Sequence, residues 1–441
     1  MKFFIIILFL IILFQALISS EIIYTFKRNF ELNEKMTEED IYLKLAYNDI
    51  YTSIKLGTPQ KEIKVGIKFK DKSLVILGSS IKGREIFDET RSSSYNSIQS
   101  IYCVNTPMSE ANKSEEYIYL NTINNKEKIT FILATELDNE NEPIYYSGYL
   151  GLSINSEFQS DFPESLPIYL NEKINKKYNS AFAIIFNNNE HGNFNGKLVM
   201  NGYPHEYDKN NYNKKQYKTS RIQSTGIYND WCLSIDNTFY GNTSIIHDHF
   251  LIFRIESGII KAPRKFMDYI TKKYFDTYGE KCHYNSSGLM FDDYKYYVCN
   301  KDIDITKFEN INFELKAINF NFTLSYKELF FEYNNKYYFL MASSSDSSEH
   351  FTIGTILMKK YDFVFDKFNS NIGFYDKSIK VDESNYFIIF IIIISVLVFL
   401  IILVLIYLVW KYFNKPRNSR KNELNDDYNY ISAINADEKE G

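Results

Sequence analysis

The chain has 441 residues, of which 45% are hydrophobic and 17% aromatic, and its formal net charge at pH 7 is −5. This charge is small for the length and offers no basic stripe, so the composition excludes a nucleic-acid-binding protein. The sequence contains neither a phosphate-binding loop nor a Gly-x-Ser-x-Gly nucleophile motif, and no cofactor is predicted.

Two apolar segments lie near the ends of the chain. Residues 3–14 are apolar behind Lys2, and small residues follow up to Ser20, which is typical of a signal peptide over residues 1–20. Residues 387–409 are apolar with Ser395 as the small polar interruption, which predicts a transmembrane helix. Because lysines and arginines follow this segment, the positive-inside rule places the tail, residues 410–441, in the cytosol. We therefore predict a single-pass type I membrane protein of the cell surface or endomembranes, with a luminal or extracellular folded part.

The stretch between these segments has room for one folded domain over residues 50–376, after a short N-terminal segment (21–49) and before a connector (377–386). Two of its predicted strands end in similar ways. Apolar and polar residues alternate through Ile67 up to Lys68-Phe69-Lys70, as in a half-buried strand. A second alternation passes through Phe253 to 254–256, which read Arg-Ile-Glu.

Six short motifs between residues 54 and 374 are specific through their common order rather than singly. They are residues 54–60 with the strand that follows, 146–152, 196–202, Trp231, the second strand up to Pro263, and 351–354 with Tyr361, Phe365 and 372–374. Together they resemble the pepsin-like aspartic protease family. The resemblance implies an all-β, bilobal acid protease fold with a few short helices, and lobes at about 50–200 and 201–376. The alternative is an unrelated all-β ectodomain.

The same alignment places Lys68 and Arg254 where the family has its two catalytic aspartates. That reaction needs two carboxylates that share one proton. An arginine stays protonated, and a lysine beside it is a second cation that cannot polarise water. Phe69 and Ile255 replace the family's threonines and have no side-chain donor. We therefore expect no catalytic residue, and interpret the chain as a pseudoenzyme that binds a peptide or protein.

Two other functions stay open. Asp71 and Glu256 are candidate displaced carboxylates of an active membrane-bound aspartic endopeptidase, although Asp71 lies on the opposite strand face from Lys68. The other alternative is a structural surface protein with a vestigial cleft, in which both carboxylates are solvated.

The cleft itself suggests binding residues. A floor lined by Lys68 and Arg254 would favour an acidic ligand. Tyr117 and Tyr119 lie in the region that resembles the family's flap, and either cover the cleft or serve as ordinary strand aromatics. The oligomeric state is left open.

The four cysteines fit the oxidising compartment that the signal peptide implies. The resemblance implies a disulfide between Cys282 and Cys299, whereas Cys103 and Cys232 are left either paired or free. Glycosylation sequons fit a luminal domain and occur at Asn112, Asn242, Asn285 and Asn321.

The sequence also contains two weaker motifs, a histidine pair and a tyrosine-based motif in the tail. His247 and His249 have the spacing of a metal pair on one strand face, but nothing completes four ligands, and no metal is predicted. In the polar tail, Tyr428 and Ile431 form a Tyr-x-x-bulky pattern that resembles an endocytic sorting signal.

Overall fold

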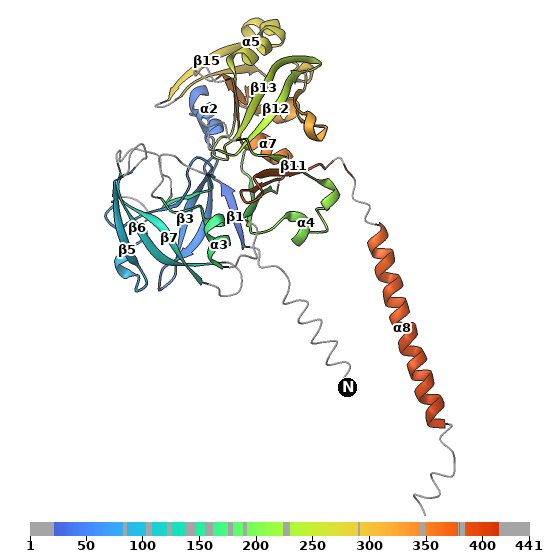
Figure 1. Ribbon diagram of the computed structural model, residues 1–441. Coiled ribbons are helices and arrows are strands. Elements are labelled where there is room, and N and C mark those ends of the chain that lie inside the picture. Colours follow the sequence, from blue (N-terminus) through green and yellow to red (C-terminus); the bar gives the residue numbers. More distant parts are fainter. Residues whose placement is uncertain are drawn as a thin grey trace, which may run out of the picture. The chain divides into compact units, whose positions relative to one another are not determined.

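Strands dominate the chain from Ile22 to Tyr375 (Figure 1). The computed structural model describes residues 22–82, 86–102, 108–120, 126–137, 146–154, 162–174, 180–187, 192–223, 230–289, 292–343, 349–377, 379 and 384–413. The chain divides into two compact units, Met1–Ile379 and Lys380–Gly441. The predicted signal peptide, Cys103 and the tail residues Tyr428 and Ile431 lie outside the described residues.

The first lobe is a closed β-barrel, because β2 pairs with both β3 and β6. In order around the barrel, its strands are β2 (Ile50–Leu56), β3 (Lys61–Lys68), β8 (Gly148–Gly151), β4 (Leu74–Leu77), β7 (Lys126–Leu137) and β6 (Met108–Tyr119), with β5 (Asn96–Tyr102) beside β6. The alternation that predicted β3 places Ile63, Val65 and Ile67 inside, at no more than 2% exposure.

A second group of strands continues the same sheet between the lobes. In order they are β11 (Tyr217–Arg221), β24 (Asn371–Tyr375), β23 (Phe363–Asp366), β9 (Ala181–Phe186), β10 (Asn195–Met200) and β1 (Ile22–Arg28). Strands from both halves of the sequence therefore meet in one interlobe sheet, which ties the lobes together.

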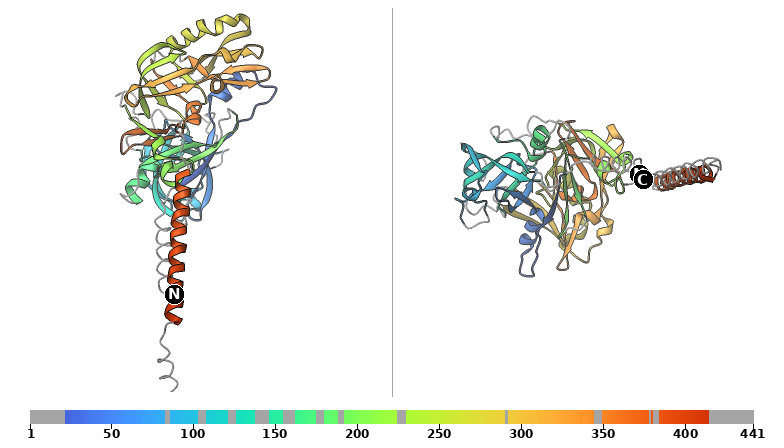
Figure 2. Two further views of the ribbon diagram at one scale, coloured as in Figure 1. Left: turned by 90° about the vertical axis from the view of Figure 1, so that its right-hand side faces the viewer. Right: turned by 90° about the horizontal axis from the view of Figure 1, so that it is seen from below.

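The second lobe is built on a separate sheet (Figure 2). Its order is β18 (Phe320–Leu324), β17 (Ile311–Leu315), β12 (Cys232–Tyr240), β13 (Thr243–Phe253), β22 (Phe351–Ile353), β14 (Ile260–Ala262), β21 (Met341–Ser343), β16 (Asp292–Asn300), β20 (Lys336–Phe339) and β19 (Phe330–Tyr333), with β15 (Cys282–Leu289) paired to β16. This architecture confirms the predicted mainly β, two-lobed fold.

Helices are few and mostly short. They are α2 (Glu38–Ala46), α3 (Leu166–Ile174), α4 (Pro204–Tyr207), α5 (Arg264–Lys273), α6 (Tyr326–Leu329), α7 (Thr355–Lys360) and α8 (Ser384–Phe413). Short 3₁₀ turns span Glu89–Arg91, Lys214–Gln216, Phe275–Lys281, Ile305–Lys307 and Lys316–Ile318.

The N-terminal segment belongs to the folded domain, whereas residues 21–49 were predicted to precede it. Strand β1 lies between β10 and β2, with Ile22, Tyr24 and Phe26 buried. Helix α2 follows, and Thr37 and Asp40 cap its first turn reciprocally. Both features were visible in the sequence, as a two-residue alternation and as a capping box.

The second unit contains α8, which extends a few residues beyond the predicted span 387–409 at each end. Its 30 residues rise about 45 Å, more than the roughly 30 Å of a bilayer core. It is the one helix among the described residues that is long and apolar enough to cross a membrane.

Candidate functional site

Strands β3 and β13 end in the same three-stranded arrangement, once in each lobe. In the first lobe β3 runs parallel to β8, with Lys68 opposite Gly151, and β4 lies antiparallel on the other side of β8. In the second lobe β13 runs parallel to β22, with Phe253 opposite Ile353, and β14 is antiparallel to β22. Lys68 at the end of β3 and Arg254 directly after β13 therefore occupy corresponding positions.

The two loops that follow these strands also correspond. The backbone of one glycine packs against each loop so closely that no side chain would fit there. A Cβ on Gly151 would lie 2.5 Å from the Asp71 carbonyl oxygen, and one on Gly354 would lie 2.3 Å from that of Ser257. Asp71 and Ser257 stand at the same distance along the chain from Lys68 and Arg254. The loops are thus equivalent residue by residue.

Arg254 is largely buried and is held by two carboxylates. Its guanidinium donates to the Asp230 carboxylate, and its Nε lies 3.8 Å from Glu256 Oε1. Burial alone would lower the pKa of Arg254, but the hydrogen bond and charge of Asp230, with the charges of Glu256 and Asp71, hold that pKa above its ordinary value. Arg254 therefore stays a paired cation and cannot exchange protons with a substrate.

Lys68 is more accessible, with 35% of its side chain exposed against 18% for Arg254. Its ammonium group lies 3.7 Å from Asp71 Oδ2 and 4.3 Å from the centre of the Tyr149 ring. These contacts keep the ammonium between an anion and an aromatic face. Lys68 is thus also a paired cation.

Glu256 connects the two loops across the lobes. Its Oε2 accepts a hydrogen bond from the backbone N–H of Phe69 at 2.9 Å, while Oε1 faces Arg254. The candidate displaced carboxylates are therefore each directed at a cation, Asp71 at Lys68 and Glu256 at Arg254. A pair that activates water must instead share a proton.

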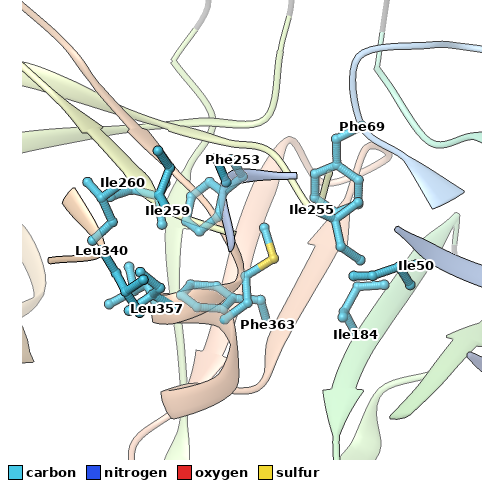
Figure 3. Close-up of a cluster of buried hydrophobic side chains, with 14 of the residues drawn as sticks. Ile50, Phe69, Ile184, Phe253, Ile255, Ile259, Ile260, Leu340, Leu357 and Phe363 are labelled. Atoms are coloured by element: carbon cyan, nitrogen blue, oxygen red, sulfur yellow. The ribbon is translucent and has the colours of Figure 1, made fainter. Parts of the chain in front are cut away.

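Phe69 and Ile255, which the resemblance aligns with the family's threonines, are fully buried where the lobes meet (Figure 3). The Phe69 ring packs edge to face on Phe365, with centroids 4.9 Å apart, and on Phe182 at 5.9 Å. Aromatic contacts of this kind add to the burial of apolar surface. A hydrophobic junction, supported by the hydrogen bond from Phe69 N–H to Glu256, thus stands where the resemblance implies two threonines.

The charges of the two loops balance, which corrects the expectation that the floor would favour an acidic ligand. Lys68 and Arg254 each have carboxylate partners, so they present little unpaired positive charge. Asp230, which belongs to a different segment, was not predicted as a partner of Arg254. The charged residues of the two loops and their partners are Lys68, Lys70, Lys72 and Arg254 against Asp71, Glu164, Asp230 and Glu256, and Glu164 pairs with Lys72 at 2.8 Å.

The N-terminal segment reaches the second of these loops. The Asn48 amide group donates to Ser257 O and Thr355 Oγ1, both at 2.7 Å, and to Ile255 O at 3.3 Å. The Asn48 backbone N–H donates to Glu256 O at 3.0 Å. Residues that precede the first lobe thus fix the loop beside Arg254.

Helix α2 anchors the same segment to the second lobe. The Glu38 carboxylate contacts His283 at 2.7 Å and Asn285 at 3.2 Å, and pairs with Lys336. One turn later, Tyr42 stacks on Tyr296 with ring centroids 3.5 Å apart. The segment is therefore held at both ends.

We expect Asn48→Ala to lower the free energy of unfolding by about 2–3 kcal/mol, because buried acceptors would lose their donor. Asn48 is only 7% exposed, so water cannot readily replace its amide. Urea unfolding of a fragment ending at residue 379 measures the change. The control is Asn210→Ala at an exposed position, expected within about 0.5 kcal/mol of wild type. An Asn48 variant as stable as this control would contradict the anchoring role.

The structure places the two candidate flap tyrosines away from Lys68. Tyr119 of β6 lies opposite Lys55 of β2 in the sheet, and the backbone carbonyl of Tyr117 accepts a hydrogen bond from the Gly57 N–H. Both tyrosines therefore lie beside the start of β3. Lys68 ends β3 some seven residues later, or about 23 Å along the strand. The expectation that Tyr117 and Tyr119 line the cleft is therefore wrong, because the pairing of β6 with β2 places them at the other end of β3.

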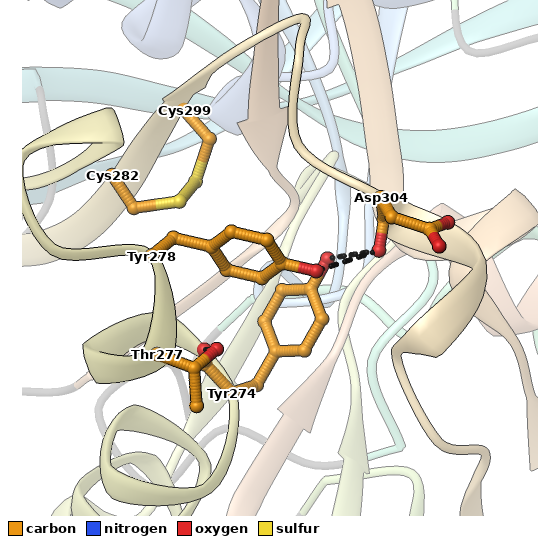
Figure 4. The surroundings of a disulfide bond; sticks show 6 residues. All are labelled: Tyr274, Thr277, Tyr278, Cys282, Cys299 and Asp304. Atoms are coloured by element: carbon orange, nitrogen blue, oxygen red, sulfur yellow. Dashed lines mark hydrogen bonds between the residues drawn. A yellow bond between two sulfur atoms is a disulfide. The ribbon is translucent and has the colours of Figure 1, made fainter.

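The disulfide joins Cys282 of β15 to Cys299 of β16, as the resemblance implied (Figure 4). Cys232 is buried and forms no disulfide with any residue that the structure describes. Burial raises the pKa of its thiol to about 12, so the thiol is neutral and inert at physiological pH. Its proposed partner, Cys103, lies outside the described residues.

The two histidines do not share a face, as had been expected from their spacing. His247 is exposed and His249 is 1% exposed, because Asp248 has a φ of +49° that interrupts the two-residue alternation. Within the described ranges, no three His, Cys, Asp or Glu side chains gather as a metal site. Of the four sequons, Asn242 and Asn321 are exposed, and Asn112 and Asn285 are half-buried.

Comparison with known proteins agrees with the geometry of the paired loops. A search of curated protein sequences found no match. The family model described as eukaryotic aspartyl protease matches residues 49–377, which include both lobes and both loops. The chain belongs to the eukaryotic aspartyl protease family.

Proposed function

We propose that this chain is a membrane-anchored pepsin-like domain that binds a peptide or protein and does not hydrolyse it. The observation that carries the proposal is the ion pairing of Lys68 with Asp71 and of Arg254 with Asp230 and Glu256. These groups stand at the two corresponding strand ends, where the family's chemistry needs a pair of carboxylates sharing one proton.

The ligand class follows from the family and from the charge balance. Pepsin-like domains take extended peptides, and a cleft with paired charges gives no strong preference for an acidic one. We therefore propose an extended peptide or a protein segment as ligand. The domain would select this ligand through hydrogen bonds and apolar contacts rather than through net charge.

The test combines cleavage with binding. We expect the purified ectodomain to leave a peptide library uncut from about pH 3 to 7, and not to bind statine-type inhibitors, which mimic the tetrahedral intermediate of the dyad. We expect the same library to yield ligands by affinity selection. Inhibitor-sensitive cleavage that is lost in Asp71→Ala or Glu256→Ala would establish the displaced dyad and overturn the proposal.

The alternatives predict different results in this experiment. An active endopeptidase needs Asp71 and Glu256 to leave their cations and share a water. A structural surface protein with a vestigial cleft would neither cut nor retain any peptide. Only the proposed binding domain retains peptides without cutting them.

We also propose a type I orientation, with the sequons on the luminal or extracellular side and the tail in the cytosol. Protease added to intact cells is expected to digest the ectodomain while an epitope tag after residue 441 stays protected. Permeabilised cells, in which the tag becomes accessible, are the control. A tag digested on intact cells would contradict the orientation.

A further inference from the structure

A basic segment without acidic residues covers one edge of the interlobe sheet. Residues 209–221 include the short turn Lys214–Gln216 and the edge strand β11, which pairs with β24. Five cations and no Asp or Glu occur in this segment. Four of them are exposed, whereas Lys218 pairs with Asp376 at 3.3 Å. The exposed cations are Lys209, Lys214, Lys215 and Arg221.

The segment is held rigidly rather than hanging from the surface. The Asn213 side chain accepts from the Lys215 backbone N–H at 2.9 Å, and Gln216 Oε1 accepts from the Asn213 N–H at 3.0 Å. The neighbouring acidic residues are Glu206 and Asp208, which precede the segment, and Asp376, which pairs with Lys218. Five cations against three acidic residues leave the edge with a net positive charge. An edge strand with exposed cations is also protected from pairing with other strands.

The same segment holds the end of the first unit. Asp376 N–H donates to Gln216 O, and the Gln216 side chain donates to Ile379 O, both at 2.8 Å. Ser384, where α8 begins, is five Cα steps from Ile379. Five steps span at most about 18 Å. If α8 crosses a membrane, this chain length allows the basic edge to reach the leaflet that α8 enters.

We propose that residues 209–221 bind anionic lipid headgroups of that leaflet. The ligand chemistry is phosphate, and the contacts are those of lysine and arginine side chains at a negatively charged surface. The inference rests on α8 spanning a membrane and, in the type I orientation proposed above, on anionic lipid in the luminal or extracellular leaflet. It is independent of whether the cleft binds peptides. It assigns the edge of the interlobe sheet a role in orienting the domain on its own bilayer.

The experiment uses the full-length chain in nanodiscs of phosphatidylcholine, with or without phosphatidylglycerol. An amine-reactive reagent labels lysines, and mass spectrometry follows the rate at each site. We expect Lys214 and Lys215 to react at least about threefold more slowly in the anionic discs, with protection lost at high salt. The internal control is Lys265 and Lys272, exposed on α5, whose rates should not change.

A variant with Lys209, Lys214, Lys215 and Arg221 changed to Gln tests the effect on the domain as a whole. Salt-dependent quenching of its tryptophan fluorescence by labelled anionic lipid should fall to the level seen in neutral discs. A variant with Lys265 and Lys272 changed to Gln should behave as wild type. Three outcomes would contradict the inference. Equal labelling rates of Lys214 and Lys215 in both lipids would overturn the proposal. Protection that appears only with two copies per disc would assign the edge to self-association and also overturn it. A chain that elutes apart from the discs would contradict the membrane span itself.

Discussion

Replacing Arg254 by aspartate is expected to destabilise the domain by about 3–5 kcal/mol instead of recreating half of an active site. The Arg254 side chain is 18% exposed, and its guanidinium neutralises Asp230 and Glu256. Its loss would place a third carboxylate beside these two in a poorly solvated position. Chemical unfolding of the ectodomain measures the loss.

Lys68→Asp is the matched control, because it introduces the same residue at the corresponding position of the other lobe. The Lys68 side chain is more exposed than that of Arg254 and has a single carboxylate partner, so the expected loss of stability is smaller. The double variant should also remain inactive, since Phe69 and Ile255 still fill the junction and Glu256 still binds the Phe69 backbone. An Arg254→Asp protein as stable as wild type, or a double variant that cuts peptides, would contradict this account.

The strand ends could be read from the sequence because they depend on local patterns. The alternation through Ile67 and Phe253 and the glycines at 151 and 354 all act within a few residues of the chain. The same patterns identified the family. The partners of the cations depend instead on tertiary structure, as with the bond from Phe69 to Glu256 across the lobes.

The partner of Arg254 could not be predicted even from the register of the neighbouring hairpin, as Asp230 shows. Strand β12 pairs Cys232 with Ile252, and this register sets Asp230 opposite Arg254. Near the turn, however, Tyr240 pairs with Thr243, and a β-bulge between Thr238 and Phe239 shifts the register by one residue. A hairpin counted from its turn would have placed residue 229 opposite Arg254. The ion pair therefore depends on an irregularity that no sequence pattern announces.

His249 is expected to make the second lobe sensitive to acid. Burial lowers its pKa to about 4, and the charges of His350 and His247 act in the same direction. Its Nε2 lies 2.8 Å from Thr238 Oγ1 of β12, and its ring packs on Phe351 of β22 with centroids 5.3 Å apart. The folded domain thus holds a neutral imidazole between two strands.

The direction of the effect follows from proton binding. The unfolded state takes up a proton at His249 near pH 6.5, and the folded state only near pH 4, so the unfolded state binds more protons in this window. The contribution of His249 to stability is therefore complete above about pH 6.5 and declines as the pH falls toward 4. A shift of this size corresponds to about 3 kcal/mol.

Urea unfolding of wild type and His249→Gln between about pH 4 and 7 measures this contribution, because glutamine can still bond Thr238 but does not titrate there. The stability of the variant relative to wild type should rise by about 3 kcal/mol as the pH is lowered across this window. All ionisable groups other than His249 are common to both proteins, so their contributions largely cancel in the difference. His247→Gln, at an exposed position of the same strand, is the matched control and should leave the pH dependence close to that of wild type. Parallel curves for wild type and His249→Gln would show that the buried imidazole does not resist protonation, and that the acid sensitivity of the lobe arises elsewhere.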